Sequence, residues 1–554
     1  NAYCNSPQCA PSRASFWSGQ YVHRVQAWNN PGGLPMDAPT FGTHLENAGY
    51  GLHVFGKTDY RVGGHSLKAR LTAWLRSANI KRPHNPRPQA TTYASPNLHP
   101  LQGERQMPPS PAAIGEGSSG RDLSPATDPL NPSPGGEGQS LPRTRSGGEG
   151  SSAQPPPGSS GTLETAPLLY PLQGERQSLP RTRSGVPTSS AETGEGSSAR
   201  NLAPSNTPKH TKHEYLTPDQ TPTRLHQKDW LQIDNTCQFL NDYSQDDPPY
   251  FLYPSTNVPH PPFRATRHYL DKIDPAAVTL PPYESDLHPV MDYMSVTKNT
   301  HGHFTDEEIL AIRRHYFAMV AETDAMLGQV LDTLEATGQL NDTYIIFASD
   351  HGEMNMEHRQ TLKNALYEAS ARVPLIVAGP GLQQGVISDE LVSLIDLFPT
   401  LMDIAGLDHP EGLDGVSLLP LCRGETSNRP NYVFSEYHSN FSNTGIAMWR
   451  QGPWKYIRYA GYDPQLFNLD DDPEEMTNLA QSHPHIVQDL DARLESLVDF
   501  NQADTQAKTN DRHNYQTWRQ PLTPAEIQEA LTNSHQGHWT PADDEEVENW
   551  LAQS

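Results

Sequence analysis

Cys9-Ala-Pro-Ser-Arg13, followed by Ala14 to Gly19, is a short segment whose residues favour a helix with a defined start and end. Pro11 suits the first helical turn, where a missing N–H costs nothing, and Gly19 suits the position just after the last turn. Cys9 would then lie at the helix N-terminus, where unpaired N–H groups and the helix dipole favour a bound anion. The segment therefore marks Cys9 as a candidate reactive residue.

Two other interpretations of Cys9 follow from its residue type. A lone cysteine is more commonly a buried structural residue than a reactive one. A thiolate activated by the helix end and by Arg13, as in cysteine phosphatases, is a second functional possibility. These few residues by themselves leave the alternatives open.

The composition of the 554-residue chain limits its domains and partners. The length leaves room for two or more domains, but 34% hydrophobic residues and 52 prolines indicate that part of the chain cannot join a core. A formal net charge of −25 argues against a nucleic-acid or anionic-membrane partner. No apolar run is long enough to span a bilayer. The four cysteines have no metal-ligand spacing and predict no disulfide framework (Cys4, Cys9, Cys237, Cys422).

The segment from about residue 84 to about residue 223 has the composition of a part that cannot pack. It is rich in Pro, Gly, Ser, Glu and Arg, and Pro100-Leu-Gln-Gly-Glu-Arg-Gln106 recurs at residues 171–177. No repeat carries an apolar face that could stack on its neighbour, so the pattern indicates a disordered, low-complexity insert and not a solenoid. A linker and a translated repeat or unspliced intron fit it equally well, and we assign it no chemistry.

The flanking sequences predict one interrupted α/β domain. Short apolar runs alternate with helical stretches, which indicates a mostly parallel sheet covered by helices on both faces. Thr305-Asp-Glu-Glu308 is a capping box that opens a long helix to about Thr337. The predicted strands are residues 51–55, 250–253, 343–349 and 373–378, and we expect the last two to be buried.

The chain from about residue 428 predicts a smaller α+β domain. A hairpin pattern covers residues 454–469, and Ile486, Leu490, Leu494 and Leu497 share one helix face. Aromatic residues in this part could line a sugar pocket, although packing is the default interpretation. The predicted regions are the first part of a catalytic domain (1–83), the insert (84–223), the rest of the catalytic domain (224–427) and the C-terminal part (428–554).

Polar residues directly follow three of the predicted strands: Lys57, the loop with His260, and Asp350-His351. The ligand crevice of an open α/β sheet lies beyond the carboxyl ends of its strands, so we expect these groups to meet at one edge. Asp350-His351 is compatible with a simple turn, but a carboxylate and an imidazole at a strand end favour a divalent cation. The default for His260 is a rigid surface loop, and the default for Lys363 is a solvated charge.

Several segments together resemble the formylglycine-dependent sulfatase family. They are Cys9-Ala-Pro-Ser-Arg13, Phe55-Gly-Lys-Thr-Asp-Tyr60, Met356-Glu-His-Arg-Gln360 and Leu466-Phe-Asn-Leu469. The resemblance covers nearly the whole chain except the insert. It implies an α/β fold of the alkaline-phosphatase type, with a mostly parallel sheet sandwiched by helices and a smaller C-terminal α+β domain.

The resemblance also implies how the sulfate ester is attacked. Cys9 would be oxidised after translation to formylglycine, the nucleophile, and Arg13 would steady it. Lys57, His260 and Lys363 would bind the sulfate and stabilise charge on it and on the departing oxygen. His260 is also the candidate acid for that oxygen.

The metal site implied by the resemblance uses Asp350, His351 and the modified Cys9 to hold one Ca²⁺ ion, with Mg²⁺ less favoured. Sulfatases take two further ligands from an Asp-Asp pair on a first strand, well before the nucleophile, and only eight residues precede Cys9. The chain therefore resembles an N-terminally truncated member, and we expect residues 1–554 not to turn over substrate. Asp37 and Asp59 are the first alternative ligands to test.

One position departs from the family pattern. Most members have His two residues after the lysine that corresponds to Lys57, whereas this chain has Asp59. The residue at this position therefore does not supply the usual base, which removes a proton from the sulfated intermediate. His65 and His358 are the candidates.

The function implied is hydrolysis of a sulfuric ester, with release of inorganic sulfate from a sulfated carbohydrate or an aryl sulfate. The resemblance points to a 2-sulfated glucuronate of glycosaminoglycans, to maturation by a formylglycine-generating enzyme, and to a secreted, lysosomal or periplasmic location. One alternative is a phosphatase or phosphodiesterase of the alkaline-phosphatase superfamily, against which Cys9 argues because those enzymes use Thr or Ser there. The other is an inactive relative that binds sulfated glycans.

Overall fold

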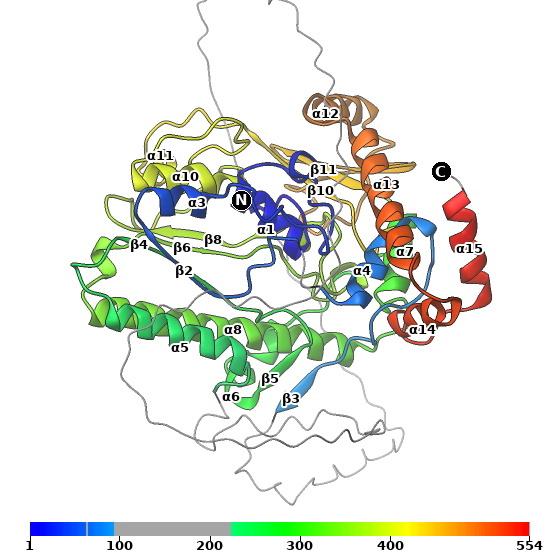
Figure 1. Cartoon of the computed structure of the whole chain (residues 1–554), viewed down its shortest axis with the longest axis horizontal. Helices are drawn as coiled ribbons and strands as arrows, with labels where there is room; N and C mark the ends of the chain where they lie inside the picture. The colour runs from blue at the N-terminus through cyan, green and yellow to red at the C-terminus, as the bar shows by residue number, and fades with distance from the viewer. Residues whose placement is uncertain (63–64, 94–222, 553–554) are drawn as a thin grey trace, which may run out of the picture. The chain divides into compact units, whose positions relative to one another are not determined.

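The computed structural model describes residues 1–62, 65–93 and 223–552, which belong to one compact unit (Figure 1). Most of the predicted insert, residues 94–222, lies outside the described residues. The predicted boundary at residue 84 is too early, because β3 (Thr91–Tyr93) pairs in parallel with β5 (Arg264–Thr266). Residues 84–93 have no hydrophobic periodicity of their own. Contacts with distant residues hold them: the His84 N–H donates to the Thr297 carbonyl at 2.9 Å, and residues 91–93 pair with β5. No described helix has the length and apolar character needed to cross a membrane.

Helix α1 (Cys9–Ser18) begins and ends as predicted, and Gly19 takes a left-handed φ of 70° after its last turn. Before it, β1 (Ala2–Tyr3) lies between β7 (Arg372–Val373), which is antiparallel, and β9 (Val392–Ser393), which is parallel. Trp17 stacks between the rings of Phe41 and Tyr60, with both centroid distances 4.2 Å. The helix that carries Cys9 is therefore fixed in the interior.

The predicted α/β arrangement is confirmed. Strands β2 (Gly51–Gly56) and β4 (Tyr250–Ser255) are parallel. Helices α5 (Gln227–Asp242) and α8 (Asp306–Ala336) run side by side along one face of these strands, and α3 (Phe41–Asn47) and α10 (Leu397–Ala405) lie along the other (Figure 1). The capping box at the start of α8 is present, with Thr305 and Glu308 each bonded to the other's backbone N–H. Apolar faces of the helices thus close the sheet on both sides.

Strands β6 (Ile345–Ala348) and β8 (Leu375–Ala378) correct the expectation of two buried strands. They pair antiparallel with each other. Their residues are half-buried or exposed, and Ile376 keeps 59% of its surface exposed. A short apolar run predicts a strand but carries no information on how completely neighbouring elements cover it.

The C-terminal part is built on an antiparallel sheet in the order β10 (Tyr432–Tyr437), β11 (Ile446–Gln451), β12 (Trp454–Tyr459) and β13 (Tyr462–Asn468). The predicted helix face is confirmed in α12 (Pro484–Leu497), where Leu490 and Leu494 are buried and pack with the sheet. The helices that follow are α13 (Phe500–Arg519), α14 (Pro524–Ser534) and α15 (Pro541–Ala552).

The remaining helices are short and connect these layers. They are α2 (Val22–Val25), α4 (Leu67–Trp74), α6 (Arg267–Leu270), α7 (Pro289–Thr297), α9 (Glu368–Ala371) and α11 (Leu419–Cys422). The C-terminal helices are bonded to the first part of the chain: Asp511 on α13 accepts hydrogen bonds from Asn29 at 2.9 Å and from Arg76 at 2.8 Å. The two parts predicted as separate regions therefore share a buried polar contact.

Candidate active site

The polar residues predicted to meet at one edge of the sheet do so around Cys9. Cys9 is the first residue of α1 and is 5% exposed. Its Sγ lies 3.2 Å from Nε2 of His351, which follows β6. Nδ1 of His351 donates to the Gly352 carbonyl at 2.8 Å, so Nε2 is directed at the sulfur. Burial opposes ionisation of Cys9, but the charges of Lys363 and His351 outweigh it and hold the pKa of the thiol well below its usual range.

Arg13 fixes Asp350 and makes no hydrogen bond to Cys9. Its Nε donates to Oδ2 of Asp350 at 2.8 Å, and its NH1 donates to the Lys57 carbonyl at 2.8 Å. Burial would raise the pKa of Asp350, but Arg13, His351 and Lys57 together hold it far below its usual range. Arg13 and Cys9 interact electrostatically, so the role of Arg13 in steadying the nucleophile stays a prediction that would act through charge and through Asp350.

Lys57 follows β2 and extends into the same cluster. Its ammonium lies 3.4 Å from the Asp59 carboxylate. Burial works against its charge, but Cys9 and Asp350 outweigh burial and raise the pKa of Lys57. Lys57 is therefore a charged donor that interacts electrostatically with Cys9.

His260 and Lys363 form a hydrogen-bonded pair in the same cluster. The Lys363 ammonium donates to Nε2 of His260 at 2.8 Å, and Nδ1 of His260 lies 2.7 Å from the Pro261 carbonyl. Repulsion from Lys363 and burial, with the charges of His351 and Lys57 adding to them, hold the pKa of His260 well below its usual range. His260 is therefore neutral, donates through Nδ1 and accepts through Nε2.

Three of these side chains could hold a metal ion. The ligand atoms of Cys9, Asp350 and His351 all lie within 4.8 Å of one another, and no other such group occurs in the described parts of the chain. Arg13 engages Oδ2 of Asp350, while Oδ1 faces Nε2 of His351 at 3.7 Å. A carboxylate, an imidazole and an ionised residue at position 9 fit a divalent cation. Neither Asp37 nor Asp59 is in the group.

The two candidate bases lie in different surroundings. Nδ1 of His358 is bonded to Glu284 at 2.8 Å, and its ring stacks on Tyr367 at 3.9 Å. No described contact joins His358 to Cys9. His65, by contrast, is half-buried and interacts electrostatically with Asp59, Cys9 and Lys57.

Several residues of the site were not identified from the sequence. Ser12 donates to the Asp350 carbonyl at 2.5 Å. Tyr253 and Ser255 accept from NH1 of Arg13 at 3.2 Å and 3.1 Å. Ser255 ends β4, so the rule that placed Lys57 and His260 beyond the strand ends would also have placed Ser255 there. Ser12 and Tyr253 carry no such signal.

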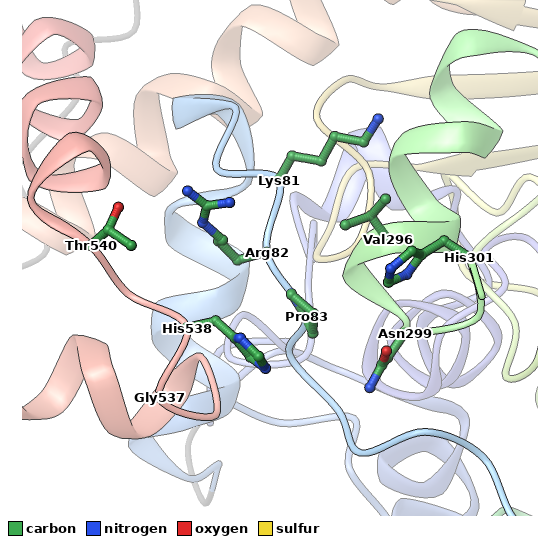
Figure 2. Close-up of a pocket in the computed structure, with 9 residues that line it drawn as sticks. All are labelled: Lys81, Arg82, Pro83, Val296, Asn299, His301, Gly537, His538 and Thr540. Carbon is green, nitrogen blue, oxygen red and sulfur yellow. The ribbon is translucent and has the colours of Figure 1, made fainter.

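A cavity of about 760 Å³ shares no lining residue with this cluster (Figure 2). Its cations belong to existing ion pairs, since Lys81 binds Asp292 at 2.6 Å and Arg82 binds Asp543 at 3.3 Å. Figure 2 shows Lys81 reaching toward α7 and Arg82 toward Thr540. Because these charges diverge and are paired, they do not form an anion site.

The fold and the site define a class of protein: an α/β fold of the alkaline-phosphatase type with a reactive residue at a helix N-terminus and cation ligands beside it. The chain belongs to the sulfatase family. The family model described as Sulfatase matches residues 1–92 and 193–407, and the model described as N-sulphoglucosamine sulphohydrolase, C-terminal, matches residues 356–500. The resemblance seen in the sequence is thereby confirmed, and the chain is a sulfatase-family enzyme.

Similar proteins include arylsulfatase K of Danio rerio, 32% identical over 545 residues, with 94% of this chain and 80% of the relative covered. Arylsulfatase K of Homo sapiens is 29% identical, with 94% and 79% covered. The fold is similar to that of a 2-O GAG sulfatase (TM-score 0.54, 20% identity, 92% and 85% covered). It is also similar to that of the phosphonate monoester hydrolase of Agrobacterium radiobacter (TM-score 0.56, 19% identity, 90% and 87% covered). These comparisons lend no support to the expectation that residues 1–554 are inactive.

Proposed function

We propose that this chain releases inorganic sulfate from a sulfated carbohydrate, with Cys9 converted to formylglycine. The observation that carries the proposal is the convergence on Cys9 of three groups from separate parts of the fold. These are the Lys57 ammonium, the His260–Lys363 pair and the Asp350–His351 pair. A cationic pocket of this kind compensates locally for the net charge of −25, which would otherwise repel an anionic substrate.

Two groups supply chemistry that the twenty amino acids do not. Formylglycine at position 9 offers a hydrate, in which one hydroxyl can attack sulfur and the second allows the sulfate to leave. A divalent cation, preferably Ca²⁺ with Mg²⁺ as the alternative, would be held by Asp350, His351 and residue 9 and would lower the pKa of a hydroxyl there. Arg13 holds Asp350 in place for that role.

The remaining residues bind the sulfate and move protons. Lys57 and Lys363 place two ammonium groups around a sulfate on residue 9 and stabilise the charge that develops on its oxygens. In the structure, Nε2 of His260 accepts a hydrogen bond from Lys363. We infer that Lys363 supplies the proton for the departing oxygen, either directly or by way of Nε2 of His260. His65 is the proposed base, because its electrostatic partners include Cys9, whereas His358 is committed to Glu284.

A polar cavity of about 370 Å³ beside Lys57 supports a carbohydrate substrate. It is lined by Gly56, Lys57, Asp59, Lys228, Asp229, Gln232 and Asn257. Lys228 is exposed and makes no ion pair with any described residue, so its ammonium is available to a carboxylate. This arrangement fits a uronate that carries the sulfate, and the similarity to arylsulfatase K and to the fold of a 2-O GAG sulfatase supports a 2-sulfated glucuronate as the first substrate to test.

Maturation and location follow from the same proposal. Cys9 would be the substrate of a formylglycine-generating enzyme, and the protein would be secreted, lysosomal or periplasmic. The present Cys9–His351 contact represents the unconverted thiol.

The deciding experiment measures the hydrolysis of several esters by the same preparation of the protein. Protein made with a formylglycine-generating enzyme is assayed on a sulfate monoester, a phosphate monoester and a phosphonate monoester of the same aryl alcohol, and on a 2-sulfated uronate disaccharide. We expect kcat/KM to be highest for the sulfates. Preference for the phosphate or phosphonate would favour the alternative enzyme class, and binding of sulfated glycan without hydrolysis would favour the inactive relative.

A further inference from the structure

The segment from Glu353 to Asn364, here called the Lys363 loop, has an unusual backbone. Six non-glycine residues in it have left-handed φ values between 45° and 87°: Asn355, Met356, His358, Arg359, Leu362 and Asn364. Both neighbours of Lys363 are among them. Side chains rarely tolerate this conformation, and it persists only where the surroundings determine the backbone at many points.

Buried polar groups hold one side of the Lys363 loop. The buried Glu353 carboxylate accepts from the Leu362 N–H at 2.5 Å and from the Asn355 N–H at 3.3 Å. The buried Arg313 of α8 donates to the Asn355 carbonyl at 2.8 Å. The loop is therefore fixed at its start and just before Lys363.

The loop is also tied to the segment that leads into Cys9. The Asn364 N–H donates to the Pro7 carbonyl at 3.2 Å, and its side-chain amide donates to the Tyr437 hydroxyl at 2.9 Å. Pro7 is two residues before Cys9. A shift of the loop would therefore change the position of Lys363 relative to the reactive residue.

Lys298 is a further buried anchor of the Lys363 loop. It follows the last residue of α7, is 1% exposed, and its ammonium donates to the Lys363 carbonyl at 2.5 Å. Its electrostatic partners are Glu353 and Lys363. Burial lowers the pKa of Lys298 to about 7, although Glu353 opposes the shift. An apolar side chain would fill the same space without the free-energy cost of removing an ammonium group from water. We therefore infer that the ammonium of Lys298 has a specific role.

We propose that Lys298 is a positioning residue for Lys363. By fixing the Lys363 carbonyl, its ammonium sets the direction in which the Lys363 side chain leaves the strained backbone to reach Nε2 of His260. The inference rests on the proposed function, because that function gives Lys363 its role toward the sulfate. Nothing in the sequence around Lys298 signals this task.

A double-mutant cycle tests the proposal. Lys298→Met is expected to lower kcat/KM for a small aryl sulfate by about 10-fold or more, because small displacements of a charged group at a reacting centre are expensive. In a Lys363→Met background the same change should have almost no further effect, since Lys298 acts through Lys363. Lys81→Met, at a surface cation outside the loop, is the control and should leave the rate unchanged. An equal loss in both backgrounds, or no loss in either, would overturn the proposal.

Amide hydrogen exchange separates this inference from the proposed function. Lys298→Met should speed exchange at Leu362 and Asn364 while the melting temperature stays within a few degrees of the parent value. If the parent shows no sulfatase activity but the loop still loosens, the proposed function fails and the anchoring role stands. Unchanged exchange in the loop would overturn the anchoring role.

If Lys298→Met does not fold, Leu362→Gly provides the second variant. Glycine adopts the φ of 64° at this position without strain and frees the backbone beside Lys363. We expect the same dependence on Lys363: a loss of kcat/KM in the parent and little further loss with Lys363→Met. Full activity of Leu362→Gly would show that the shape of the loop does not matter.

Discussion

Replacing Arg13 with methionine tests the ion pair on which the geometry of the site depends. The side chains of Arg13 and Asp350 are 6% and 12% exposed and meet at 2.8 Å. Methionine retains most of the volume but leaves the Asp350 carboxylate without its partner. Removing one partner of a buried pair typically costs about 3–5 kcal/mol. We expect the free energy of unfolding to fall by about that amount at pH 7.

The loss of stability in Arg13→Met is expected to depend on pH. In the parent, the pKa of folded Asp350 lies below its unfolded value, so this carboxylate contributes stability that is full above about pH 4 and is lost as the pH falls further. In Arg13→Met, only His351 and Lys57 still oppose burial, so the pKa of Asp350 rises toward the protonated acid. As the pH falls, protonation of Asp350 removes the unpaired buried charge. The loss of unfolding free energy relative to the parent should therefore be largest near pH 7 and should shrink toward pH 4.

Urea unfolding followed by tryptophan fluorescence measures the effect, with a chelator present so that bound metal does not contribute. Arg24→Met is the matched control. Arg24 pairs with Asp414 but is 40% exposed, so the expected change is below about 1 kcal/mol. A loss below about 1 kcal/mol for Arg13→Met at pH 7, or a loss that does not change with pH, would refute the reasoning.

Three further predictions concern the nucleophile, the insert and the substrate. Mass spectrometry should find an aldehyde at Cys9 after production with a formylglycine-generating enzyme. Cys9→Ser should release no more than one equivalent of product per protein molecule. Steady turnover by that variant would contradict the need for a second hydroxyl. Replacing residues 95–221 by a short Gly/Ser linker should leave the melting temperature and the activity unchanged, because the segment lacks apolar residues for a core. A large drop in melting temperature would show that the segment packs against the rest of the protein. Lys228→Ala should raise KM for a 2-sulfated uronate by about 10-fold and leave an aryl sulfate without a carboxylate unaffected. Lys68→Ala, in α4 and outside the lining of this cavity, is the control. Equal effects on both substrates would place Lys228 outside sugar recognition.

The sequence by itself determined the local elements and the family. Pro11 and Gly19 predicted the limits of α1, and the Thr305–Glu308 capping box predicted the start of α8, because both depend on contacts within a few residues along the chain. The placement of Lys57, His260 and Asp350 at one edge could also be predicted, since each follows a strand. The low-complexity composition predicted an insert, although Thr91–Tyr93, within its first ten residues, pair with a distant strand.

Only the tertiary structure decided which side chains touch. Arg13 lies one helical turn after Cys9, yet its hydrogen bonds go to Asp350, 337 positions away. Lys298 reaches the Lys363 carbonyl across 65 positions, and no local pattern distinguishes a buried lysine at a helix end from a solvated one. The two candidate bases looked equivalent until His358 was found bonded to Glu284. Such contacts depend on how distant segments pack, and on the balance between desolvation and charge at each position, which sequence spacing does not encode.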